Sequence, residues 1–262
     1  MVLSLTQAAL SVASGSLVGF SLGLVGGGGS ILAVPLLIYV VGVTDPHMAI
    51  GTSAIAVAVS ALANLLHHGR AGNVKWTCAA VFAAAGIAGA FLGSTVGKWV
   101  DGQKLLIAFA ILMLVVAALM LRKRASAGDS GVHLNRANLP WLVGIGFGTG
   151  ALSGFFGIGG GFLIVPGLML ATGMPILSAV GSSLVAVTAF GLTTAANYAV
   201  SGLVDWSLAA LFLVGGALGG FAGATAARHL AQQKGRLNVV FAVLIALVAT
   251  YMLVRTLGLA AA

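Results

Sequence analysis

The sequence predicts an all-α polytopic membrane protein with about ten transmembrane segments, arranged as two inverted five-segment repeats with broken, glycine-interrupted helices. Three observations lead to this prediction. Only 6% of the 262 residues are charged, whereas charged residues make up about a quarter of an ordinary soluble domain. Apolar stretches of bilayer-spanning length recur along the chain, whose mean hydropathy is +1.15. The two halves of the chain also repeat each other.

The first repeat, residues 1–121, contains five apolar segments. Four long segments are expected at residues 5–25, 47–66, 76–97 and 105–121, and a short one at residues 30–43. A run of four glycines precedes the short segment, and a turn of Thr44, Asp45 and Pro46 follows it. Because about 14 helical residues span only about 21 Å, we expect this glycine turn to lie below the membrane surface.

Residues 122–139 form the only long polar stretch, and we interpret them as a linker. The second repeat, residues 140–262, shows the same succession of segments. They are expected at residues 140–156, 162–171, 176–199, 206–228 and 237–254. The second segment of this repeat is again short and again follows a glycine-rich turn.

The repeat can be followed residue by residue. At an offset of 131, eight residues of the first glycine-rich region meet identical residues in the second half: Gly19, Gly23, Gly26, Gly28, Gly29, Leu32, Val34 and Pro35. At an offset of 130, Gly51, Ser53 and Trp76 meet identical residues as well. Matched short segments interrupted by Gly or Pro are typical of secondary transporters, whose binding site lies between the repeats.

The positions of Lys and Arg predict the orientation, because cytoplasmic loops are enriched in them. If each half crosses five times, nine of the twelve lie on one face and three, Lys98, Lys104 and Arg255, on the other. If each short segment enters the membrane and returns, each half crosses four times and the split is seven against five. The larger bias favours ten segments, a cytoplasmic linker at residues 122–139, and both termini outside.

The two glycine turns are the candidate substrate site. A glycine turn that opens a helix presents backbone amides and the positive end of the helix dipole, which attract anions. The expected binding residues are Gly26, Gly27, Gly28, Gly29, Ser30, Gly157, Ile158, Gly159, Gly160 and Gly161. Alternatively, these glycines only allow close helix packing, as we expect for two ladders, Gly86, Gly89, Gly93 and Gly216, Gly219, Gly223.

Further candidates are polar residues and prolines at matched positions. Thr52, Ser53, Ser182 and Ser183 carry hydroxyls that can donate to an anion without burying a charge. Their alternative role is to bond to helix carbonyls or across helices. Pro35 and Pro166 are candidates for gating, and so are Asn64 and Asn197, for which capping near the membrane surface is the favoured interpretation.

Several classes of protein are disfavoured. Asp45, Asp101, Asp129 and Asp205 are the only acids and fall in turns or the linker, whereas cation pathways commonly use intramembrane carboxylates. An anionic substrate is therefore favoured. Ser30 and Ile31 replace the Lys-Ser/Thr of a nucleotide-binding loop. We predict no enzymatic activity and no cofactor or metal site. We also predict no nucleic-acid partner, because the basic residues lie at the ends of apolar segments.

These motifs together resemble the sulfite exporter TauE/SafE family of membrane anion permeases. Residues 19–35, GFSLGLVGGGGSILAVP, are the most specific part, and residues 46–53, 157–166 and 181–183 support it. The resemblance implies a permease of a bacterial cytoplasmic (inner) membrane that moves small sulfur-containing anions such as sulfite, organosulfonates or thiosulfate. A cysteine relay for thiosulfate is not available, because Cys78 is the only cysteine.

We therefore expect a secondary transporter that works by alternating access between two inverted repeats embedded in membrane lipid. The alternatives are a channel for small anions and an ion-coupled importer of another small organic anion. The sequence leaves open which anion is moved and in which direction. It also leaves open whether a proton or sodium ion is coupled, and whether the chain forms a homo-oligomer.

Overall fold

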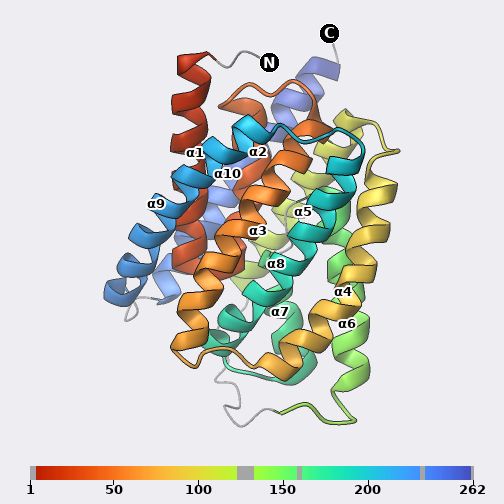
Figure 1. The fold of residues 1–262 in the computed structure, drawn as a ribbon, viewed down its shortest axis with the longest axis vertical. Coiled ribbons are helices and arrows are strands. Elements are labelled where there is room, and N and C mark those ends of the chain that lie inside the picture. Colours follow the sequence, from red (N-terminus) through yellow and green to blue (C-terminus); the bar gives the residue numbers. More distant parts are fainter. Residues whose placement is uncertain (1–3, 123–132, 158–160, 231–233, 261–262) are drawn as a thin grey trace.

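The chain folds into a bundle of helices. The computed structural model describes residues 4–122, 133–157, 161–230 and 234–260, and all regular structure in these ranges is helical (Figure 1). The first half forms α1 (Leu5–Val25), the 3-10 helix η1 (Gly26–Leu32), α2 (Ala33–Tyr39), α3 (Pro46–Arg70), α4 (Trp76–Gly97) and α5 (Gly102–Arg122). The second half forms α6 (Leu139–Phe156), α7 (Gly161–Thr172), α8 (Ile176–Val200), α9 (Trp206–Leu230) and α10 (Lys234–Ala260). The prediction of an all-α protein is confirmed.

Seven helices among the described residues are long and apolar enough to cross a membrane. Three shorter apolar stretches, Gly29–Tyr39, Gly161–Thr172 and Ala242–Gly258, accompany them, and the first two are the short segments predicted after the glycine turns. The chain is thus a multi-pass membrane protein by length and hydropathy, whereas a total of ten crossings stays a prediction.

Asp residues begin three of the long helices. The carboxylate of Asp45 accepts a hydrogen bond from the backbone N–H of His47 at 2.8 Å at the start of α3. Asp101 accepts from the amides of Gln103 and Lys104 at 3.1 Å before α5, and Asp205 accepts from the first turn of α9 at 3.0 Å. Such caps satisfy amides that have no partner inside the helix, which explains why these acids lie at helix ends.

The principal helix contacts join the two halves. Helix α1 packs on α9, α4 on α6, α3 on α8, and α5 on α10. The first two pairs are equivalent in the repeat, because α1 corresponds to α6 and α9 to α4. Figure 1 shows that α1 begins at the end of the molecule where both termini lie, whereas α6 begins at the opposite end. Each half therefore buries its helices against the other half.

The glycine ladders allow the closest of these contacts. A Cβ at Gly93 or Gly154 would overlap the backbone carbonyl oxygen of the facing helix in the α4–α6 pair. Gly19 and Gly219 are equally close to backbone oxygens in the α1–α9 pair. The predicted role of the ladders in close helix packing is confirmed, since small residues let helix backbones approach.

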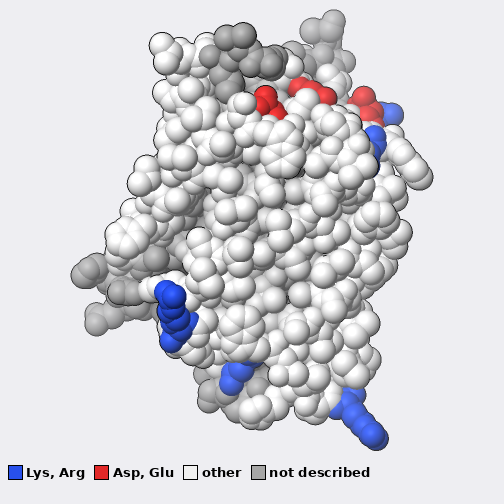
Figure 2. All heavy atoms as spheres, viewed as in Figure 1, with Lys and Arg blue, Asp and Glu red and all other residues white. Residues whose placement is uncertain are grey.

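Charged side chains lie at the two ends of the molecule. On the face in Figure 2, a broad middle band carries no Lys, Arg, Asp or Glu, and the acids gather at the end where the termini lie. The loops that carry Asp45, Asp101 and Asp205 lie at that end in Figure 1, and the loop between α3 and α4 lies at the opposite end. The uncharged band matches the surface that a bilayer would cover.

Candidate functional site

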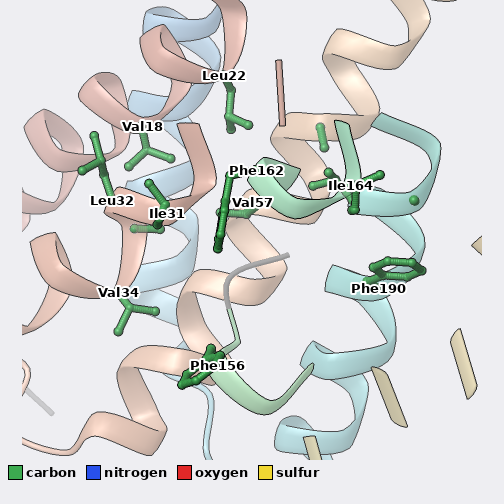
Figure 3. Close-up of a cluster of buried hydrophobic side chains, with 14 of the residues drawn as sticks. Val18, Leu22, Ile31, Leu32, Val34, Val57, Phe156, Phe162, Ile164 and Phe190 are labelled. Atoms are coloured by element: carbon green, nitrogen blue, oxygen red, sulfur yellow. The ribbon is translucent and has the colours of Figure 1, made fainter. Parts of the chain in front are cut away.

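The two glycine-interrupted segments meet in the interior between the halves. Helix η1 contacts α7, and both contact α8. Ile31 on η1 and Phe162 on α7, which are equivalent residues in the repeat, are both buried. Figure 3 shows them close to Val57 of α3, among other apolar side chains of the core. The end of η1 and the start of α7 thus contribute apolar side chains to one buried cluster.

The first glycine turn is more regular than the sequence suggests. Gly26, Gly27, Gly28, Gly29 and Ser30 all belong to the 3-10 helix η1, and Ser30 is fully buried. A Cβ at Gly29 would overlap the backbone of α1 at Leu22. Because a 3-10 helix uses its amides in i→i+3 hydrogen bonds, fewer amides remain for a ligand than an irregular turn would present. Pro35 lies in α2 and is buried.

The second glycine turn begins with a left-handed residue. Gly157 ends α6 with φ of +67°, a conformation that favours glycine. A Cβ there would also overlap the side chain of Ile50 on α3. Ile158, Gly159 and Gly160 lie outside the described residues, and Gly161 begins α7, which contains Pro166. Gly157, at the end of α6, therefore packs directly against α3 of the other half.

Thr52 and Ser182 form equivalent contacts between the halves. The backbone N–H of Asp205 donates to Thr52 Oγ1 at 3.0 Å, and the backbone N–H of Lys75 donates to Ser182 Oγ at 2.8 Å. The two acceptors are 130 residues apart, and so are the two donors. Each hydroxyl therefore holds the loop that precedes a helix of the other half.

The neighbouring glycines explain why these loops come so close. A Cβ at Gly51 would overlap the carbonyl oxygen of Leu203, and a Cβ at Gly181 would overlap that of Asn73. We name the two arrangements the Thr52 contact (Gly51 and Thr52 with the loop 201–205) and the Ser182 contact (Gly181 and Ser182 with the loop 71–75). They lie near opposite ends of the bundle (Figure 1).

Ser53 and Ser183 are used within their own helices. Ser53 Oγ donates to the carbonyl oxygen of Ile50 at 3.0 Å, and Ser183 Oγ donates to that of Val180 at 2.8 Å. Thr52 and Ser182, by contrast, are acceptors, and among the described residues neither of their hydroxyls donates a hydrogen bond. A hydroxyl has one proton to donate, so Thr52 and Ser182 are better placed than their neighbours to bind an anion.

The two asparagines are bonded near helix ends. Asn64 Nδ2 donates to the Ser60 carbonyl oxygen at 2.9 Å within α3. Asn197 joins α8 to α4, because its Nδ2 donates to Ser94 Oγ at 2.6 Å and its Oδ1 accepts from Lys98 Nζ at 2.8 Å. Both asparagines thus have structural bonds, and a role in gating stays a prediction.

Sequence reasoning did not single out Ser153. Its side chain is fully buried on α6, one turn before Gly157, and its Oγ has no hydrogen-bond partner among the described residues. Unsatisfied buried hydroxyls are uncommon and mark places where a ligand or water can bind. The repeat gave no signal for Ser153, because Leu22 stands at the equivalent position. Only its place beside a glycine turn could have indicated it.

Comparison with known proteins identifies the family of the chain. Residues 11–252 match the family model described as sulfite exporter TauE/SafE. A protein of Xylella fastidiosa (strain Temecula1) named "Probable membrane transporter protein" is 53% identical over 248 residues, covering 94% of this chain and 95% of that protein.

More distant relatives carry similar names. "Probable membrane transporter protein YunE" of Bacillus subtilis (strain 168) is 29% identical over 230 residues, covering 79% of this chain and 84% of that protein. No solved structure matches the chain significantly. The family model spans nearly the whole sequence, including both glycine turns. The chain therefore belongs to the sulfite exporter TauE/SafE family of membrane transporters.

Proposed function

We propose that this chain is a secondary transporter of small sulfur-containing anions, such as sulfite, organosulfonates or thiosulfate, in a bacterial inner membrane. It works by alternating access between two inverted repeats. The observation that carries the proposal is the pairing of the Thr52 contact with the Ser182 contact. One equivalent closing contact near each end of the bundle is the arrangement that alternating access requires, since only one end opens at a time.

The directions of the helices support inverted repeats. Equivalent helices α1 and α6 begin at opposite ends of the molecule in Figure 1, as two halves of opposite orientation would. Opening at one end would then separate Thr52 from the loop 201–205. Opening at the other end would separate Ser182 from the loop 71–75. The two openings are chemically alike because the sequence of one half repeats the other.

The polar groups near these contacts suit an anion. Asp45, Asp101 and Asp205 are held at helix ends, and no acid stands inside any of the apolar helices. The donors available to an anion include the hydroxyl protons of Thr52 and Ser182, the buried hydroxyl of Ser153 and amides at the glycine turns. Neutral donors aimed at a small oxyanion bind it without an unpaired buried charge, which would be costly in a membrane.

The charge distribution supports a cytoplasmic linker. Arg70 and Lys75 flank the loop at the end opposite the termini, and Arg136 precedes α6 at that same end. The end with the termini carries Asp45, Asp101 and Asp205 together with Lys98 and Lys104, so it has no such excess of basic residues. The positive-inside tendency therefore favours a cytoplasmic side for the α3–α4 loop and the linker.

Counterflow in proteoliposomes tests the proposal. Vesicles loaded with unlabelled sulfite, methanesulfonate or thiosulfate receive the labelled anion outside. A carrier produces a transient accumulation of label above equilibrium, whereas a channel only lets the label equilibrate. We expect overshoot with at least one of the three anions. Absence of flux with all three, or equilibration without overshoot, would contradict the proposed function.

Conservative substitutions test the two hydroxyls. Thr52→Val and Ser182→Ala each remove a donor, and a hydrogen bond to a charged ligand contributes about 1.5–3 kcal/mol. We expect the anion concentration for half-maximal exchange to rise about tenfold or more in each. Thr52→Ser and Ser182→Thr keep a hydroxyl and should stay near the wild type. Thr250→Val, on the exposed face of α10, is the control.

A further inference from the structure

A polar cluster lies where the start of α3 meets the end of α8, at the end of the molecule that carries the termini. The rings of His47 and Tyr198 stand 6.4 Å apart between centroids, with 33° between their planes. A Cβ on Gly51 would come within 2.9 Å of the Cβ of Tyr198, so the glycine allows α3 and α8 to approach here. Lys98 Nζ lies 5.9 Å from the centre of the Tyr198 ring.

Two polar atoms of this cluster are buried without a hydrogen-bond partner among the described residues. They are His47 Nδ1 and the hydroxyl of Tyr198, whose side chain is fully buried. Native proteins rarely leave such atoms unsatisfied, and the exceptions often bind or exchange something. The Lys98 ammonium differs, because it donates to the carbonyl oxygen of Asn197 at 3.1 Å, to its Oδ1 at 2.8 Å, and to Ser201 Oγ at 2.8 Å.

The charged groups around His47 come from four neighbouring parts of the chain. Asp45 caps the same helix and accepts from the His47 amide. Asp101 precedes Gly102 of α5, which packs against Pro46, and Lys104 follows in the first turn of α5. Asp205 lies on the loop that contacts Thr52, and Lys98 ends α4. Three carboxylates and two ammonium groups therefore stand on the parts of the chain that meet at this end of the bundle.

A proton is the ligand that fits these groups. Imidazole is the side chain whose charge changes near neutral pH, and a protonated imidazole has two N–H donors. Once protonated, His47 can donate through Nδ1 to the Tyr198 oxygen, directly or through one water, which gives both unsatisfied atoms a partner. The charge then stands five residues before Thr52 on the same helix, about 7.5 Å along its axis, at the end of the bundle that carries the Thr52 contact.

We propose that His47 is the proton-binding site of this transporter, that Tyr198 positions its imidazole, and that a proton therefore travels with the anion. The inference rests on the proposed function and adds its coupling ion. The physical reason is reciprocity: a positive charge near Thr52 strengthens anion binding, and a bound anion strengthens proton binding by the same factor. Neither His67 nor His68, which lie at the other end of α3, is required for this step.

Transport against a gradient tests the proposal. Proteoliposomes receive labelled methanesulfonate, which stays ionised at all pH values used, or sulfite if only sulfite exchanges. Valinomycin with equal potassium on both sides holds the membrane potential at zero, and the outside is made one pH unit more acidic. One proton per anion then accumulates the anion about tenfold inside. This ratio is thermodynamic, so the random orientation of the protein in the vesicles does not alter it.

Three variants test whether His47 is responsible for the proton-driven accumulation. His47→Gln is expected to lower the accumulation ratio from about tenfold to about one while measurable counterflow persists, which shows a folded carrier. Tyr198→Phe should shift the pH at which the initial rate of proton-driven uptake is half-maximal while the final accumulation ratio stays the same, a readout that a purely structural role would not move. His133→Gln, in the segment before α6, is the matched control and should accumulate the anion as the wild type does. Any contribution from protonation of sulfite itself is the same in both proteins.

Each outcome decides between the two proposals. Wild-type counterflow without accumulation under the pH gradient overturns the proton site but keeps the proposed function. Accumulation driven by a sodium gradient, or undiminished in His47→Gln, overturns it as well. Absence of counterflow in the wild type overturns the proposed function itself.

Discussion

The Ser182 contact can be tested with the chain's own cysteine. Cys78 is the only cysteine and is buried in the first turn of α4, three residues after Lys75. Ser182 holds this helix start through the backbone N–H of Lys75 at 2.8 Å. Ser182→Ala removes the acceptor of this hydrogen bond. If the contact closes this end of the transporter, Cys78 should become more accessible to a small maleimide.

The size of the effect follows from the hydrogen bond. Removing one partner of a buried pair costs about 1–3 kcal/mol. Lys75 is partly exposed, so water can replace part of the lost bond and the lower part of that range applies. A shift of about 1–2 kcal/mol in the opening equilibrium raises the open population about 5- to 30-fold. When opening and closing are fast, the labelling rate of Cys78 rises by the same factor.

The assay measures the labelling rate of Cys78 in detergent-purified protein by mass spectrometry. Ser182→Thr keeps the acceptor and should label as the wild type does. Thr52→Val weakens the equivalent contact at the other end and should not accelerate labelling. If Ser182→Ala labels no faster than the wild type, or if Thr52→Val accelerates labelling equally, the two contacts do not close separate ends.

Two further predictions concern stability. Gly157→Ala forces a Cβ into the left-handed region and against Ile50, so we expect a loss of at least about 1–2 kcal/mol. Its control, Gly144→Ala, meets nothing within 4 Å and should leave the thermal midpoint in detergent unchanged. Phe190→Ala empties a fully buried site stacked on Phe82 and should cost about 3–5 kcal/mol. Phe221→Ala, at a side chain that is 78% exposed, should shift the midpoint little, and equal shifts in both Phe variants would contradict this assignment.

Much of the fold could be predicted because a membrane-spanning segment is recognised from the length and hydropathy of its own residues. The expected segment at residues 76–97 coincides with α4, and the one at residues 140–156 lies within α6. The short segments after the glycine turns also appear, as α2 with part of η1 and as α7. Segment length and hydropathy depend on the bilayer thickness, which is the same for every segment. Membrane segments can therefore be predicted without knowledge of contacts between distant residues.

The candidate site was less predictable. Thr52 and Ser53 are adjacent hydroxyl residues, and sequence reasoning treated them alike. Successive residues of a helix point about 100° apart, so Thr52 faces the loop before α9 whereas Ser53 returns to the Ile50 carbonyl. The run of glycines likewise reads as an irregular turn but folds as the 3-10 helix η1, because it packs against α1.

The sequence by itself determined that this chain is an all-helical membrane protein in the sulfite exporter TauE/SafE family, and it predicts two homologous halves. These properties follow from local hydropathy and from residue identities at fixed offsets. Only the tertiary structure decided which hydroxyls bond across the halves, and that His47, Lys98 and Tyr198 meet at one end. These residues come from α3, α4 and α8, and their proximity depends on close helix packing at glycines such as Gly51. Contacts between residues far apart along the chain arise only when the whole bundle packs.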